Sequence, residues 1–369
     1  MATIGRRALG RATLERQLLL RRSDMPVTDA VEHLVGLQAQ TPHTWYVGLW
    51  TRLNGFRPEH AADLLTGRRL VRTALMRSTI HLVTADDCLA LRPVVQPVLD
   101  RDLFTNHTHR KPIEGMDTDE LVTAGRALLE EQPCTPGELG ALLRRRWPDR
   151  AAASMAYAVR NLAPLVQVPP RGLWGVSGQP RHVTAEHWLG RSLDTAPSPE
   201  KMALRYLAAF GPATVKDMQT WSGLTRLREV VDRLRPRLLT FTGEQGQELF
   251  DLPDAPRPDP DTPAPPRFLY DFDNLLLSHA DRSRVMTDAC REPWVFPKHG
   301  PVPGIVLVDG FTGGTWKITK HRGAATLTVR PFARLSPESA DALTDEGARL
   351  LAFAAAGAET HDVRLLPAT

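Results

Sequence analysis

Residues 165–176 read LVQVPPRGLWGV, two short apolar runs on either side of a Pro-Pro-Arg-Gly turn. This pattern predicts a β-hairpin with strands at 165–168 and 173–176. Three segments with helical spacing of apolar residues precede it, at 119–132, 135–143 and 152–163. Three helices followed by a hairpin is the order of elements in a winged helix, a variant of the helix-turn-helix. The stretch 117–188 therefore predicts one such module.

The same order returns from Ser198 onward. Helices are predicted at 200–210, 215–221 and 225–234, followed by a hairpin with strands at 238–242 and 248–252. The first 90 residues fit the same plan with longer helices, at 12–22, 27–37, 43–53 and 60–67, and with strands at 70–76 and 78–83. We therefore predict three tandem winged-helix modules, which cover residues 1–112, 113–195 and 196–252.

The chain changes character after residue 252. Seven prolines between 253 and 266 predict a stiff polar linker over 253–267, because proline cannot donate to a sheet ladder. Strands are then predicted at 305–308, 315–319 and 326–332, with a turn at 310–314 and an amphipathic helix at 337–356. Residues 268–369 are thus expected to form a small β-barrel or sandwich closed by the terminal helix. The predicted fold class is α+β.

The composition describes an ordinary globular chain of 369 residues with a formal net charge of +4. Arginine supplies 40 of the 46 basic residues, and its planar guanidinium suits phosphate. The start lacks the apolar core of a signal peptide, and no apolar run reaches the roughly 18 residues of a membrane span. Cys88, Cys134 and Cys290 form no metal-binding pattern. We expect a cytoplasmic, nucleoid-associated protein without membrane, metal or cofactor.

Gln38-Ala39-Gln40 places two neutral amides inside the otherwise apolar stretch 34–50, at the end of a predicted helix. Taken alone, such a pair is more often a helix end with solvated amides. Burying an amide without a hydrogen-bond partner costs about 1–3 kcal/mol, so a buried pair of amides is expected to bind a polar group or a water. A carboxamide is no general base near neutral pH, but it donates and accepts hydrogen bonds at once. It can orient a water, which suffices only where the leaving group is already activated.

Segment 37–42 resembles the active-site motif of the winged-helix DNA glycosylases of the AlkZ and YcaQ type. The resemblance continues in the family's order through 77–83, 273–282, 308–310 and 314–316. In that family the motif is Gln, an apolar residue, then Gln or Asp. With Gln40 at the second place, the chain is similar to the AlkZ branch, the self-resistance glycosylases for azinomycin-type DNA crosslinks. The resemblance implies winged helices packed into a C-shape around duplex DNA, and hydrolytic release of N7-alkylated purines.

The chemistry of the motif agrees with that resemblance. An N7-alkylated guanine is cationic, so its glycosidic bond is already weakened and needs no general acid. We assign Gln38 and Gln40 as joint holders of a water below the deoxyribose, with amide oxygens facing the developing positive charge. With Gln rather than Asp at position 40, we expect the enzyme to accept only those substrates whose modified base is a good leaving group. Lyase activity is not expected, since no lysine stands near the motif.

Further residues are candidate contacts to duplex DNA that carries an alkylated or crosslinked guanine, bound by a monomer. They are Arg77, Ser78, Thr79 and His81 at a predicted wing, then His279, Arg282 and Arg284, and the basic residues Lys298, His299 and Lys317. Trp45 and Tyr46 could stack on a base or sugar, although their apolar spacing favours a core position.

Two other functions stay open on the residues alone. A winged-helix transcriptional regulator would use the same modules to bind an operator and would release no free base. A nuclease would need clustered carboxylates for metal ions, and the aspartates at 251, 254, 259 and 261 lie in or beside a proline linker poorly shaped for that purpose.

Overall fold

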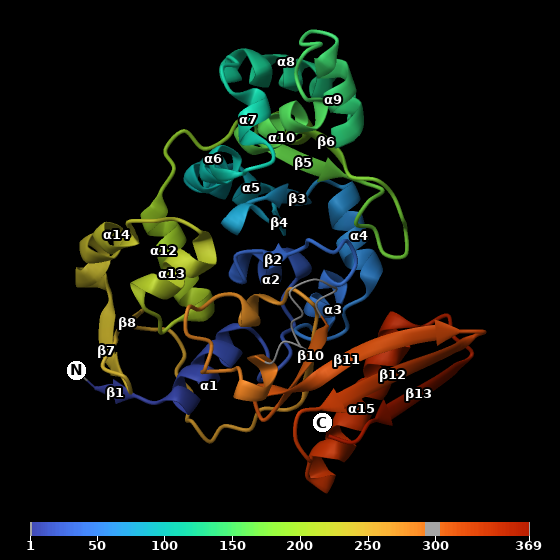
Figure 1. Ribbon diagram of the computed structural model, residues 1–369. Helices are drawn as coiled ribbons and strands as arrows, with labels where there is room; N and C mark the ends of the chain where they lie inside the picture. Colours follow the sequence, from blue (N-terminus) through green and yellow to red (C-terminus); the bar gives the residue numbers. More distant parts are fainter. Residues whose placement is uncertain (1, 292–302, 369) are drawn as a thin grey trace.

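Three β-sheets organise the computed structural model, which describes residues 2–291 and 303–368 (Figure 1). The central sheet has the strand order β2-β4-β3-β5-β6, with β2 (Leu37–Gln38), β3 (Leu70–Ala74), β4 (Ile80–Thr84), β5 (Leu165–Val168) and β6 (Arg181–Thr184). A second sheet, in the order β1-β7-β8, joins β1 (Thr3–Ile4) to the hairpin of β7 (Leu239–Gly243) and β8 (Glu248–Asp251). The third sheet has the order β13-β12-β11-β10-β9, with β9 (Arg267–Leu269), β10 (Gly304–Val308), β11 (Phe311–His321), β12 (Ala324–Pro331) and β13 (Thr360–Leu365).

Helices surround these sheets. In chain order they are α1 (Arg6–Arg16), α2 (Val27–His33), α3 (Trp45–Trp50), α4 (Pro58–Thr66), α5 (Ala85–Val94), α6 (Gln96–Thr105), α7 (Arg110–Ile113), α8 (Thr118–Glu131), α9 (Pro136–Arg144), α10 (Ala152–Leu162), α11 (Ala185–Leu189), α12 (Pro199–Phe210), α13 (Val215–Ser222), α14 (Leu227–Leu234) and α15 (Pro337–Ala354). Within the described ranges, none of them is long and apolar enough to cross a membrane.

The predicted order of three helices and a hairpin is present twice. It runs from α8 to β6 and again from α12 to β8. Capping boxes at Thr135 and Thr214 begin the second helix of each run, because each hydroxyl and the acid three residues later satisfy free backbone N–H groups. The winged-helix interpretation, the module boundaries and the C-shaped arrangement stay predictions.

One hairpin partner was predicted wrongly. The strand that pairs with β5 is β6, not 173–176. The apolar run 173–176 instead leads Trp174 into an aromatic cluster, where its ring lies 4.9 Å from Tyr46 and 5.4 Å from Phe353. Burial of a large aromatic ring outweighs the few ladder hydrogen bonds that a short edge strand would gain. β5 also pairs with β3, with Arg72 opposite Gln167, so the first two predicted modules share one sheet.

The N-terminal elements differ from the predicted helices at their ends. The helix predicted at 12–22 is α1, which ends at Arg16, and the helix predicted at 27–37 is α2, which ends at His33. Val35 and Gly36 then adopt positive φ angles of 54° and 85°, a conformation that breaks a helix. The chain emerges as strand β2, so Gln38 lies in a strand and Gln40 just after it, not at the helix end that we expected.

The predicted linker, residues 253–267, packs against helix α1 as an extended segment, which we call the strap. Three arginines of α1 donate hydrogen bonds to its carbonyl groups: Arg7 to Pro260 at 2.8 Å, Arg11 to Thr262 at 2.7 Å and Arg16 to Pro256 at 3.2 Å. Arg16 also forms a fully buried bidentate pair with Asp251, at 2.6 and 2.9 Å. These contacts fix the strap against the first helix.

The C-terminal region contains one open sheet and not the small barrel or sandwich that we expected. β9 and β13 form its two edges, and β13 runs parallel to β12. β11 begins at Phe311, so most of the predicted turn at 310–314 belongs to a strand. The long β11–β12 hairpin extends away from the central sheet (Figure 1).

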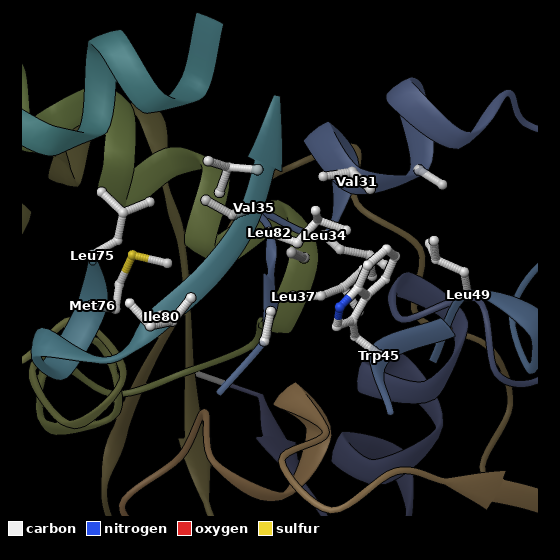
Figure 2. Close-up of a cluster of buried hydrophobic side chains, with 14 of the residues drawn as sticks. Val31, Leu34, Val35, Leu37, Trp45, Leu49, Leu75, Met76, Ile80 and Leu82 are labelled. Atoms are coloured by element: carbon white, nitrogen blue, oxygen red, sulfur yellow. The ribbon is translucent and has the colours of Figure 1, made fainter. Parts of the chain in front are cut away.

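The main hydrophobic core lies under the Gln38-Ala39-Gln40 motif. Leu34, Leu37 and Trp45 pack there with Ile80 and Leu82 of β4 (Figure 2). The rings of Trp45 and Tyr46 stack at 3.8 Å, and the Tyr46 hydroxyl donates to the Gly172 carbonyl at 3.0 Å. Both side chains are fully buried, which confirms the core position.

Candidate active site

Strand β2 fixes the backbone of the Gln38-Ala39-Gln40 motif. Leu37 pairs with Leu82 and Gln38 with His81 on β4, and the Ala39 N–H donates to the Ile80 carbonyl at 2.7 Å. The carbonyl of Ala39 accepts from Arg72 Nη2 at 2.7 Å. Leu37 and Ala39 are buried in the core, so the two glutamine side chains leave the strand on the opposite side.

Asn274 holds the same backbone from the other side. Its Nδ2 donates to the Gly36 carbonyl at 2.6 Å, and its Oδ1 accepts from the Gln38 N–H at 3.2 Å. The preceding residue, Asp273, forms a buried bidentate pair with Arg52 at 2.7 and 2.8 Å. A short 3-10 helix, Asn274–Leu276, is thereby locked beneath the motif. The side chain of Asn274 thus satisfies the backbone on both sides of residue 37.

Gln38 is the enclosed member of the pair. Its side chain is only 4% exposed, and its Oε1 accepts from Arg77 Nη2 at 2.6 Å. A guanidinium only donates hydrogen bonds, so the amide oxygen must face Arg77 and the amide N–H₂ group must face the other way. Burial lowers the pKa of Arg77 to about 10, with a further contribution from the charge of Arg282. Arg77 therefore remains cationic at neutral pH.

Gln40 is the accessible member. Its side chain is exposed, and its Oε1 accepts from the Ile80 N–H at 3.2 Å. It lines a pocket of about 540 Å³ together with Arg77, Ser78 and Thr79 of the β3–β4 turn. The amide keeps one oxygen lone pair and two N–H donors for a ligand or a water. The two glutamines are therefore not equivalent, which the sequence alone did not indicate.

A family model described as DNA glycosylase AlkZ-like matches residues 31–353, which is most of the chain and includes the motif. The chain belongs to the AlkZ-like family of DNA glycosylases. The interstrand DNA cross-link repair glycosylase of Streptomyces sahachiroi is 25% identical over 350 residues, which cover 86% of this chain and 88% of that protein. The solved structure of Streptomyces sahachiroi DNA glycosylase AlkZ shares the fold, with a TM-score of 0.78, 21% identity and coverage of 99% and 100% of the two chains.

Family membership confirms the resemblance seen in the sequence. Because the family consists of DNA glycosylases, this chain is an enzyme that acts on DNA, and the regulator and nuclease alternatives are set aside.

In this AlkZ-like glycosylase the predicted wing at Arg77–Thr79 is tied into the protein. Arg77 and Ser78 adopt positive φ angles of 56° and 59°, and Arg77 also donates to the carbonyl of Trp221 on α13. Ser78 Oγ donates to Asp102 at 2.8 Å, and Thr79 Oγ1 donates to the Met76 carbonyl at 3.0 Å. These residues therefore shape the pocket beside Gln40.

Three predicted DNA contacts are corrected by burial. His81 and His279 are each 1% exposed, and burial lowers the pKa of each ring to about 3. His279 Nε2 lies 3.1 Å from the Phe210 carbonyl. Arg284 is also buried and donates to the Pro212 carbonyl at 2.8 Å and to Thr13 Oγ1 at 3.2 Å. Side chains sealed in this way cannot contact DNA.

The other predicted contacts have different positions. Arg282 is half-buried and lies close enough to Arg77 to lower its pKa. Lys317 is exposed on β11. Lys298 and His299 lie outside the described residues. Arg282 and Lys317 stay candidates for binding DNA.

Sequence reasoning missed two residues of the site, Asn274 and Asp102. The signal for Asn274 was a polar residue directly before three leucines, in a segment that resembles the family. Asp102 has no such signal, because it follows Asp100 and Arg101 in a charged stretch of the kind that usually faces solvent.

Proposed function

We propose that this enzyme hydrolyses the N-glycosidic bond of N7-alkylated purines in duplex DNA and that its substrates include azinomycin-type interstrand crosslinks. The observation that carries the proposal is the neutral amide of Gln40, exposed in a pocket while the motif's backbone is fixed by Asn274 and Arg72. The printed name of the Streptomyces sahachiroi relative, a crosslink repair glycosylase, supports the choice of substrate.

The reaction needs little from the protein, since an N7-alkylated purine leaves as a neutral base. The free lone pair of Gln40 Oε1 accepts from a water and turns the water's oxygen toward the anomeric carbon. The sugar gains positive charge as the base leaves, and the amide oxygen faces that charge. No proton has to be removed before the bond breaks, so a non-basic side chain is sufficient.

Gln38 has a supporting role in this mechanism. Its oxygen already accepts from the cationic Arg77, and little of its surface is exposed. We assign the direct contact with the water to Gln40 and a supporting contact to Gln38. By accepting from Arg77, Gln38 also fixes the position of that guanidinium in the wall of the pocket that Gln40 lines.

DNA binding is assigned to exposed basic residues outside the pocket. The β11–β12 hairpin carries five of them, Lys317, Lys320, His321, Arg322 and Arg330. Their positions on one projecting hairpin suit insertion into a groove or contact with phosphates. The enzyme would act as a monomer on chromosomal DNA in the cytoplasm, in self-resistance and repair, without a cofactor.

The test is a base-release assay. Purified enzyme is incubated with a duplex that contains 7-methylguanine and with an azinomycin-crosslinked duplex, and free base and alkali-labile sites are measured. We expect free base from both substrates and no strand cleavage before alkali treatment. Tight binding of both duplexes without any base release would overturn the proposal.

A further inference from the structure

The pocket beside Gln40 continues away from the motif, between the β3–β4 turn, α6, α9 and α10. We propose that it receives the alkylated guanine itself and that Asp102 recognises the Watson–Crick edge of that base. The inference rests on the proposed function, because it names the base that occupies the site where Gln40 holds the water.

The size and walls of the pocket suit a nucleobase. Its volume of about 540 Å³ lies in the usual range for small-molecule sites, about 300–1,000 Å³. One part of its wall is apolar and includes Leu139, Ala156 and Leu165. Another part is polar, with Ser78, Asp102 and Tyr157. A purine has apolar faces and polar edges, so the two kinds of wall complement it.

Asp102 is held as an oriented acceptor on α6. Its Oδ2 accepts from Ser78 Oγ at 2.8 Å and from Tyr157 Oη at 2.6 Å. Tyr157 is itself positioned by the ring of His109, which stacks on it at 4.2 Å with an angle of 23°. Over residues 2–291 and 303–368, Oδ1 of Asp102 accepts no hydrogen bond and the carboxylate forms no ion pair. One carboxylate oxygen is thus free for a ligand.

Guanine presents the donors that this carboxylate requires. Its Watson–Crick edge carries N1–H and the exocyclic N2 amino group, and the free Oδ1 of Asp102 can accept from the N2 amino group while Oδ2 stays bound to Ser78 and Tyr157. The corresponding edge of adenine has an acceptor at N1, which a carboxylate repels. Alkylation at N7 adds a positive charge to guanine, which strengthens the attraction to Asp102. Arg160 lines the same pocket and is a donor suited to guanine O6.

Entry into the pocket requires the base to leave the stack, so the inference applies to monoadducts such as 7-methylguanine and not to a guanine still joined to the opposite strand. Unstacking is least costly for a damaged base, so extrusion itself favours an alkylated guanine over its neighbours. A site that hydrogen-bonds polar groups of its substrate strongly rejects an analogue that lacks them. Asp102 is therefore a residue that determines specificity, and Gln40 remains the residue that contacts the water.

The test compares two duplexes that differ in one group of the base. One carries 7-methylguanine and the other 7-methylhypoxanthine, which also has a methyl group at N7 but lacks the N2 amino group. Single-turnover release rates are divided by the uncatalysed depurination rate of each duplex. We expect the wild-type enzyme to prefer 7-methylguanine by tenfold or more. Equal corrected rates for the wild type would overturn the inference, whatever happens to the variants.

Asp102→Asn then assigns the preference to a residue. We expect its 7-methylguanine rate to fall roughly ten- to hundredfold and its preference to shrink, with duplex affinity unchanged in fluorescence anisotropy. Asp100→Asn on the same helix is the matched control and should behave as the wild type. Tyr157→Phe leaves the carboxylate in place and should retain the preference, even if Asp102→Asn fails to fold.

The outcomes separate this inference from the proposed function. Base release with an unchanged preference in a folded Asp102→Asn variant overturns only the role of Asp102. Absence of base release from every cationic purine overturns the proposed function as well.

Discussion

Replacing Asn274 with alanine removes the side chain that holds the backbone on both sides of Leu37. Two buried backbone groups, the Gly36 carbonyl and the Gln38 N–H, lose their partner. Each unpaired buried group costs about 1–3 kcal/mol, so we expect the free energy of unfolding to fall by about 2–6 kcal/mol. Typical domains have about 5–15 kcal/mol of stability, so the variant should still fold. A displacement of the motif by about 1 Å should slow base release about 10²-fold.

The assay combines three measurements on one preparation. Urea unfolding gives the loss of stability, anisotropy gives the affinity for duplex DNA, and single-turnover release of 7-methylguanine gives the rate. Asn274→Asp keeps the volume but places a carboxylate oxygen against the Gly36 carbonyl, so it should be at least as slow as Asn274→Ala. Asn54→Ala is the matched control, because the Asn54 side chain is exposed and donates to Asp24 and to the Arg22 carbonyl, outside the candidate site. A folded Asn274→Ala enzyme with the wild-type rate and stability would refute the reasoning.

Three further predictions follow from the described contacts. Burial depresses the pKa of His81 to about 3 and of His182 to about 4, so both rings are neutral in the folded protein at neutral pH. Both rings take up a proton on unfolding below about pH 6.5. The free energy of unfolding should therefore be constant above about pH 6.5 and should fall by about 1.4 kcal/mol per pH unit for each ring as the pH drops toward about 4. Urea unfolding at pH 7 and pH 5 measures this, and equal slopes for the wild type and His182→Gln would contradict it. Arg52→Ala leaves Asp273 buried without its cation and should cost about 3–5 kcal/mol in urea unfolding, whereas replacing both residues with apolar ones should restore most of that loss. Arg322→Ala should weaken duplex binding and reduce the slope of log affinity against log salt by about 1, and an unchanged slope would show that the hairpin tip does not contact phosphate.

Local signals in the sequence predicted much of the secondary structure. Thr135 and Glu138 have the spacing of a capping box in the sequence, and they begin α9 at the start of the helix predicted at 135–143. The strands of the β3–β4 and β7–β8 hairpins were predicted to within about two residues at each end. These features depend on neighbours in the chain, which is why the sequence alone reveals them.

Features that depend on distant residues could not be predicted. The pairing of β3 with β5 brings Arg72 opposite Gln167, and no local pattern indicates it. Arg284 looked like a phosphate ligand, but Thr13 and Pro212, far away in the sequence, enclose it.

In the candidate site, too, local features could be predicted and contacts between distant residues could not. The sequence identified Gln38 and Gln40 as the chemical centre only when the resemblance to the glycosylase family was added to their type and spacing. The difference between them arises from contacts across the chain. Arg77 reaches Gln38 from the β3–β4 turn, and the Ile80 N–H fixes Gln40 at the pocket. Such contacts depend on the tertiary fold and leave no periodic signal.

The central claim is that neutral amides holding one water are sufficient to release a cationic purine. Its most direct test is the single-turnover release of 7-methylguanine by Gln40→Ala and Gln38→Ala, with duplex affinity measured in parallel. By analogy with other positioned dipoles, we expect Gln40→Ala to lose about 10²–10³-fold in rate, Gln38→Ala to lose less, and both to bind DNA as the wild type does. Full activity of Gln40→Ala on this duplex would contradict the account.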